Sequence, residues 1–98
     1  MGYMEGDTVT ITFDDARAIA ATSKSVRDYW GDYRILDWGW ENDQEFVLVY
    51  DLIDPEVVPF DIPALLVDKR TGKLREVYGL VGNPPAPNLT PVGHNPNP

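Results

Sequence analysis

Two short segments that are apolar on both faces constrain the fold of this 98-residue chain more than any other feature. In "QEFVLVYDL" (44–52) every side chain from Phe46 to Tyr50 is apolar or aromatic, and "ALLVD" (64–68) has the same character. Successive side chains of a strand point to opposite faces of the sheet. The pattern therefore predicts two central strands that must be covered on both sides.

The first third of the chain predicts one strand followed by one helix. Apolar residues alternate with threonine in "DTVTITF" (7–13), which is typical of a half-buried strand. In "DDARAIAATSKSVRDYW" (14–30) small apolar residues recur at steps of three and four, which indicates a helix packed closely on a sheet. Asp14 or Asp15 can cap its start, and Gly31 can end it.

The middle of the chain predicts shorter strands separated by turns and one extended loop. "YRILDWGWEND" (33–43) is a short strand in which Gly39 marks a bulge, before an Asn-Asp turn. Residues 51–63 carry prolines at 55, 59 and 63 and predict an extended loop. "DKRTGK" (68–73) predicts a hairpin turn, with Thr71-Gly72 at its left-handed position and its basic residues in a solvated tip. "KLREVYGL" (73–80) predicts the last strand.

These elements predict an α+β fold with the order β-α-β-β-β. One N-terminal helix packs on an antiparallel sheet of about four strands, in two layers. Residues 1–81 form a single domain, and 82–98 are a Pro/Asn-rich tail that forms no core element: either disordered or an arm laid over the domain. The second sheet face needs a cover, either this arm or a second copy of the chain, over four residues: Val47, Val49, Leu65 and Val67.

Charge and cysteine content exclude several classes of function. Eight Lys and Arg face sixteen Asp and Glu, a net charge of −8, which disfavours nucleic acid and acidic membrane surfaces and allows a basic protein partner. The absence of cysteine excludes disulfides and thiol catalysis. The sequence contains neither a signal-peptide pattern nor an apolar run of membrane-spanning length, so a cytoplasmic location is expected.

The residues that catalysis or metal binding would need are scarce. His94 is the single histidine and lies in the tail, and the glycines form no phosphate-binding motif. Eight acids lie between residues 37 and 61 without a Lys or Arg among them, which predicts a solvated acidic face. We therefore expect no enzyme activity, no catalytic residue, no cofactor and no metal.

The strongest functional signal is a group of aromatic residues interleaved with acids. Two tyrosines and all three tryptophans fall within residues 29–40. Some of these rings must complete the core, because a tryptophan buries a large area. Exposed rings rimmed by acids are typical of a protein interface. The expected partner-binding residues are Tyr33, Trp38, Trp40, Glu41, Asp43, Asp54 and Glu56.

Residues 14–78 resemble the YrhB-like immunity proteins of bacterial toxin systems, and more loosely the small PepSY-like α+β domains. The resemblance is carried by a helix opening with acids and alanines, the "GW" with the following strand (39–49), and the hairpin "PALLVDKRTGK" (63–73). It implies a binder that neutralises a toxin without catalytic residues. The first strand, the acidic proline loop and the Asn-Pro tail depart from the family pattern.

The sequence thus predicts a non-enzymatic, immunity-like domain that occludes a basic protein partner. Two alternatives remain open. One is a small-ligand or carbohydrate-binding domain that uses the same rings. The other is a phage or bacterial accessory protein that forms a homo-oligomer, such as a homodimer, through the second sheet face.

Overall fold

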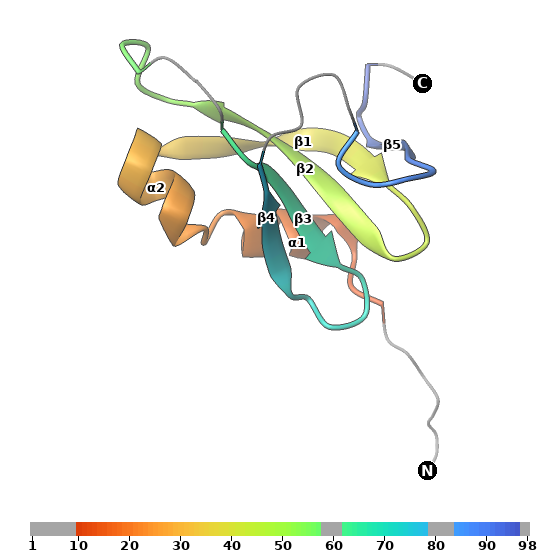
Figure 1. Cartoon of the computed structure of the whole chain (residues 1–98). Helices are drawn as coiled ribbons and strands as arrows, with labels where there is room; N and C mark the ends of the chain where they lie inside the picture. Colours follow the sequence, from red (N-terminus) through yellow and green to blue (C-terminus); the bar gives the residue numbers. More distant parts are fainter. Residues whose placement is uncertain (1–9, 58–61, 79–83, 97–98) are drawn as a thin grey trace.

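The computed structural model describes residues 10–57, 62–78 and 84–96. In these residues two helices lie on one face of a five-stranded antiparallel sheet with the strand order β4-β3-β2-β1-β5 (Figure 1). The predicted α+β class is confirmed, with one more helix and a different set of strands. The elements are α1 (Phe13–Ala20), α2 (Lys24–Trp30), β1 (Tyr33–Glu41), β2 (Glu45–Leu52), β3 (Ala64–Asp68), β4 (Leu74–Val77) and β5 (Thr90–Gly93).

The last residue of the predicted first strand, Phe13, is the first residue of α1. Residues 7–9 lie outside the described residues, and 10–12 are not in a strand. Thr12 and Asp15 form a reciprocal capping box, in which each side chain accepts a hydrogen bond from the other's backbone N–H at 3.1 Å. This cap satisfies two N–H groups at the helix start. The helix therefore begins at Phe13, which the strand prediction had placed on a sheet face.

The single predicted helix is in fact two helices, because Ser23 interrupts it. The Ser23 side chain accepts a hydrogen bond from the N–H of Val26 and caps α2. Its own N–H donates to the Tyr33 hydroxyl at 2.8 Å, and that hydroxyl donates to the carbonyl of Ala20 at 2.6 Å. Serine favours such caps over a helix interior, and the tyrosine from β1 satisfies the backbone groups that the break exposes.

Gly39 permits the close approach of β1 to β2. In the register, Ile35 faces Tyr50 and Gly39 faces Leu48, so three residues of β1 lie opposite a single residue of β2. This irregularity adjoins the predicted bulge position. A Cβ at Gly39 would overlap the carbonyl oxygen of Val47, and the Phe13 ring lies 3.4 Å from the same position. Since two residues are added rather than one, Ile35 and Gly39 stay on the same face.

The helix face of the sheet carries the larger core. Val26 of α2 and the two buried alanines of α1, Ala16 and Ala20, pack on Phe46, Leu48 and Tyr50 of β2. Leu65 and Val67 of β3 belong to this face as well, although the sequence had suggested that they lie on the opposite one. Directly opposed residues in antiparallel strands share a face, and the register pairs Val67 with Phe46 and Leu65 with Leu48.

The opposite face, here called the arm face, carries a smaller core. One row of directly opposed residues crosses all five strands on this face: Arg75, Leu66, Val47, Trp40 and Pro91. Leu66 and Val47 are buried in the middle of that row, together with Ala86 from the C-terminal arm (residues 84–96). Leu89 of the arm packs against the same cluster.

The C-terminal arm is a structural part of the fold. Residues 84–89 cross the arm face, and β5 then pairs antiparallel with β1 at the edge of the sheet (Figure 1). The Asn95 side chain donates a hydrogen bond to the carbonyl of Gly39 at 2.6 Å. The expectation that this segment forms no core element is wrong, because a prolyl residue can stand in an edge strand and Ala86 needs little space to fill the hollow above Val47.

Replacing Gly39 with alanine tests the close approach of the two strands. The added Cβ meets the Val47 carbonyl, so we expect a loss of roughly 3 kcal/mol in the free energy of unfolding, measured by urea denaturation. Ala18→Gly, an exposed site in α1, is the control and costs about 1 kcal/mol. A Gly39→Ala variant no less stable than this control would contradict the described contact.

Replacing Ala86 with aspartate tests whether the arm covers the sheet. The carboxylate would be buried against Val47 and Leu66, so the arm should detach and the melting temperature should fall. Pro84→Asp adds the same charge to an exposed position of the arm and should leave the melting temperature nearly unchanged. Equal effects of the two substitutions would show that the arm does not pack on this face.

Candidate functional site

Four of the seven expected partner-binding residues come together at one end of the sheet. Trp38, Trp40 and Glu41 lie in the second half of β1, and Asp43 lies in the turn that follows. In Figure 1 this turn joins β1 to β2 at the side of the molecule near the C-terminal arm. The structure therefore brings together only part of the predicted acidic-aromatic segment, and whether this part binds a partner stays a prediction.

Tyr33 does not belong to the surface. Its relative exposure is 8%, and its ring packs edge-on against Tyr50 with centroids 5.5 Å apart. Its hydroxyl is engaged by the backbone between the two helices. The prediction that Tyr33 binds a partner is therefore wrong. Tyr33 is buried because its hydroxyl satisfies the backbone groups at the break between the two helices.

Asp54 and Glu56 lie at the other end of β2, away from the tryptophans. Strand β2 rises about 3.3 Å per residue over its length, so the loop after Leu52 lies more than about 20 Å from the β1–β2 turn. The Asp54 carboxylate accepts a hydrogen bond from the N–H of Glu56 at 2.9 Å and shapes this loop locally. Both are exposed, but they do not share a site with Trp38 and Asp43.

The two tryptophans of β1 share the arm face and differ in their packing. Trp40 lies opposite Val47 and packs against the cluster under the arm. Trp38 lies opposite Gly93 of β5 and is half-buried, and of the described residues it joins neither core cluster. Gly39 between them faces Phe13 on the helix side. Trp38 is therefore the tryptophan available to contact a partner, whereas Trp40 packs within the fold.

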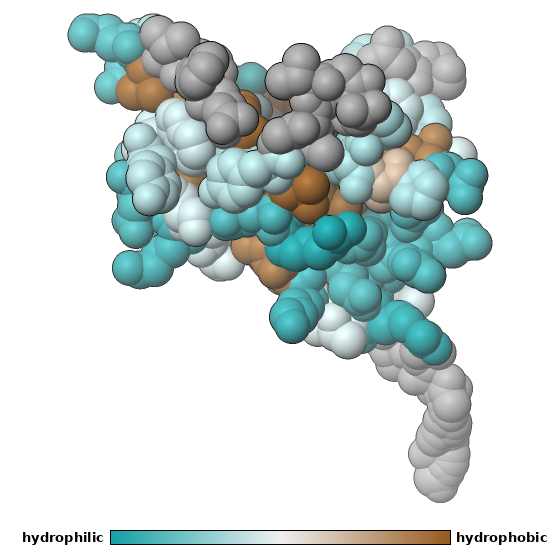
Figure 2. Space-filling model, in the orientation of Figure 1, coloured by the Kyte–Doolittle hydropathy of each residue, from teal (hydrophilic) through white to brown (hydrophobic). Residues whose placement is uncertain are grey.

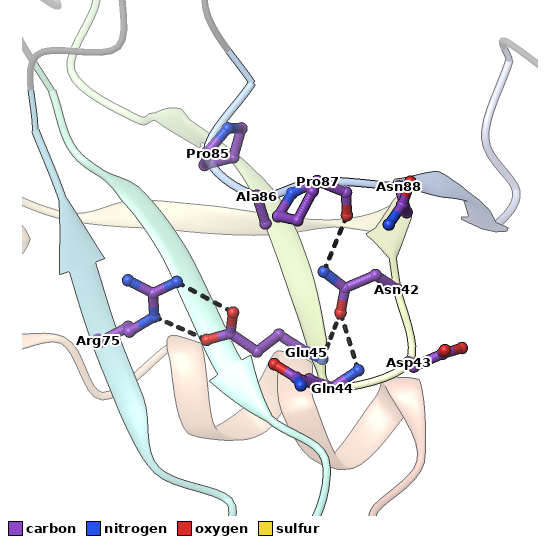
Figure 3. A pocket seen from close by; sticks show the side chains of 9 residues that line it. All are labelled: Asn42, Asp43, Gln44, Glu45, Arg75, Pro85, Ala86, Pro87 and Asn88. Carbon is purple, nitrogen blue, oxygen red and sulfur yellow. Dashed lines mark hydrogen bonds and ion pairs between the residues drawn. The ribbon is translucent and has the colours of Figure 1, made fainter.

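A groove lies beside this region, between the β1–β2 turn and the arm (Figure 3). Its volume is about 320 Å³. Asn42 shapes one wall: its side-chain oxygen accepts hydrogen bonds from the N–H groups of Gln44 and Glu45, each at 2.8 Å, and its amide donates to the carbonyl of Pro87 at 3.1 Å. The lining residues are Asn42, Asp43, Gln44, Glu45, Arg75, Pro85, Ala86, Pro87 and Asn88.

An ion pair forms the floor of this groove. Arg75 of β4 donates two hydrogen bonds to Glu45, at 2.7 and 3.0 Å, a bidentate arrangement that raises the pKa of the Arg75 guanidinium. The Glu45 side chain is 13% exposed, so its charge is satisfied mainly by Arg75. The pair spans β3, which places a charged bridge over the edge of the apolar row on the arm face.

A second hollow of about 530 Å³ adjoins the other side of this ion pair. It lies between the β1–β2 turn and the β3–β4 turn, and its lining includes Gln44, Asp68, Thr71 and Lys73. Figure 2 shows mainly hydrophilic surface over the turns at this end of the molecule. The end of the sheet is therefore a polar, grooved surface beside a half-buried tryptophan.

The predicted β3–β4 turn is present and is organised by Asp68. The Asp68 carboxylate accepts hydrogen bonds from the backbone N–H groups of Thr71 and Arg70 at 2.9 and 2.8 Å, and these bonds lower its pKa. Gly72 has φ of +72°, the left-handed position expected from the sequence. Lys69 leaves the solvated tip, because its ammonium binds Glu41 at 2.8 Å.

Ion pairs use most of the positive charge of the protein. Five are formed by the described residues, and they involve Arg17, Arg27, Arg34, Lys69 and Arg75. Of the eight basic residues, three therefore have no ion pair among the described residues: Lys24, Arg70 and Lys73. Thirteen of the sixteen acids are described, and eight of these stay outside the five pairs.

Sequence reasoning missed the groove residues of the arm and the Glu45–Arg75 pair. Glu45 and Arg75 are 30 residues apart, and their pairing follows from the strand register, which no local pattern reveals. The one available signal was the alternation of β4, which places Arg75 on the face opposite Leu74. Residues 85–88 belong to the segment 82–98 that was predicted as a tail or arm, and the sequence contains no indication that they line a groove.

Comparisons with protein-family models, with curated proteins and with solved structures found no match to this chain. The described residues contain no group of three or more His, Asp or Glu side chains that could hold a metal ion. None of the helices in the described ranges is long and apolar enough to cross a membrane.

The lowered pKa of Asp68 makes the turn sensitive to acid. A carboxylate whose pKa is depressed by folding stabilises the fold above its unfolded value, near 3.8, and this contribution is lost as pH falls through the folded value. Asp68→Ala should therefore lower the melting temperature at neutral pH and have a shrinking effect below pH 3.8. Asp43→Ala controls for the change in net charge. A pH-independent difference between Asp68→Ala and the parent would contradict this account.

Proposed function

We propose that this chain is a non-enzymatic protein-binding domain whose partner is basic, and that the second half of β1 is its contact surface. Trp38 carries the proposal. It is half-buried on the arm face, outside both core clusters of the described residues, and directly follows the exposed Asp37. An accessible tryptophan beside acids is the composition from which interface hot spots are built.

The distribution of charge supports a basic partner. Asp37 and Asp43 are exposed at either end of the Trp38–Trp40 segment, and neither is among the acids of the five ion pairs. Lys69 is bound to Glu41, the last residue of β1. An excess of carboxylates around a contact ring attracts a cationic surface over roughly one Debye length and speeds association.

The immunity-like form of this proposal rests on the sequence resemblance. A toxin inhibitor of this kind would act by covering a basic surface of its target, and such a role requires no catalytic group in the inhibitor. The present surface would supply one central ring, two flanking carboxylates and the polar rim of the neighbouring groove.

Replacing Trp38 with alanine is the direct test. Wild-type protein is immobilised, its bound partner is identified from a lysate of the source cell, and the purified partner is titrated by calorimetry. We expect Trp38→Ala to weaken binding by about 2 kcal/mol while the melting temperature stays close to that of the parent. Tyr29→Ala, which removes the most exposed aromatic ring (78%) on α2, is the control and should bind normally.

A second variant tests the charge separately from the ring. Asp37→Asn combined with Asp43→Asn keeps the side-chain shape and should slow association, with a smaller dependence on salt than the parent shows. The proposal fails if both variants bind like the parent. It also fails if the captured partner has no basic surface.

A further inference from the structure

The outer edge of β4 leaves backbone hydrogen-bonding groups without a neighbouring strand. Strand β4 stands at one end of the sheet order and pairs with β3 alone. The N–H of Asp68 donates to the carbonyl of Lys73 at 3.0 Å, so the backbone groups of Lys73 point toward β3. Since inward and outward groups alternate along an antiparallel strand, the N–H and C=O groups of Leu74 and Glu76 point away from β3.

The other edge of the sheet is protected by its sequence. Strand β5 contains Pro91, which has no N–H to donate, and it ends at Gly93 with φ of +72°. Proline in an edge strand is a common protection against the addition of another strand. No proline occurs in β4, so of the two edges in the described sheet β4 is the one that can accept a strand.

A second copy of this chain fits the β4 edge poorly. Two antiparallel copies of an edge strand related by a twofold axis place a residue directly opposite itself. For the two central residues of β4 this means Arg75 opposite Arg75, or Glu76 opposite Glu76. Like charges directly opposite each other are destabilising. In these two central registers self-pairing is disfavoured, whereas a different chain need not place like charges opposite each other.

Exposed basic side chains lie beside this edge, while its two carboxylates are engaged: Asp68 accepts the N–H groups of its own turn, and Glu76 accepts the Ser23 hydroxyl. Arg70 and Lys73 precede β4, are exposed, and are two of the three basic residues without an ion pair in the described part of the chain. Every second side chain of a strand laid along β4 would lie on the arm face, where the register also places Arg75.

We propose that the outer edge of β4 is a docking site for an extended acidic segment of another protein, which adds to the sheet as a sixth strand. The N–H and C=O groups of Leu74 and Glu76 hold its backbone, and carboxylates at alternate positions meet Lys73 and Arg70. This site differs from the proposed contact surface at Trp38 in its location on the sheet and in the sign of its charge, so each stands or falls by its own test.

Amide hydrogen exchange with synthetic peptides tests the proposal. The probe is a short peptide in which Glu alternates with Thr, and the matched peptide carries Lys in place of Glu. We expect the Glu peptide to slow exchange at the amides of Leu74 and Glu76 by at least about tenfold, and the Lys peptide to have no such effect. Protection at these two amides reports on strand addition, which a merely electrostatic association would not produce.

Charge reversal provides the matched control. Lys73→Glu should weaken the Glu peptide by about tenfold, whereas Lys24→Glu, an exposed lysine of α2 that also lacks an ion pair in the described residues, should not. The proposal is overturned if the Leu74 and Glu76 amides stay unprotected, or if both peptides bind equally. It is also overturned if sedimentation shows a dimer of the chain alone and the Leu74 and Glu76 amides are already protected in that dimer without peptide.

Discussion

The layers of this fold depend on one constraint: the central strands β2 and β3 are apolar on both faces, and both faces must be shielded from water. The helices cover one side through Ala16, Ala20 and Val26, whose small side chains let them lie close to the sheet. The other side is covered by Ala86 and Leu89 of the C-terminal arm. A 98-residue domain buries a limited fraction of its surface. The proline-rich arm therefore provides the layer that covers the second sheet face.

Polar contacts position these two covers. On the helix side, the Tyr33 hydroxyl joins the backbone of Ala20 and Ser23, and the Ser23 hydroxyl donates to Glu76 of β4 at 2.6 Å. On the arm side, Asn42 binds the carbonyl of Pro87. Such bonds contribute about 1 kcal/mol each to stability. Their larger effect is to fix which segment lies over which strand, since the apolar contacts alone are not directional.

The same packing divides the surface by charge. Lys69 and Arg75 are drawn into ion pairs with Glu41 and Glu45 at the strand ends, which removes positive charge from the region around Trp38. Arg70 and Lys73 stay at the β3–β4 turn. An acidic protein thus presents an acidic aromatic segment along β1 and a basic corner beside β4, and these two surfaces are the basis of the two binding proposals.

Local patterns in the sequence determined the α+β class, the two-sided strands at 44–52 and 64–68, and the Asp68–Gly72 turn, because alternation and turn chemistry act between near neighbours. Tertiary structure decided the rest. Tyr33 is buried because a helix break ten residues away needs its hydroxyl. Leu66 rather than Leu65 faces the arm because the register with β2 sets the pleat of β3. The groove beside Glu45 exists because Arg75 and the arm, which are distant in the sequence, lie next to it in the fold. No local sequence pattern predicts such long-range contacts.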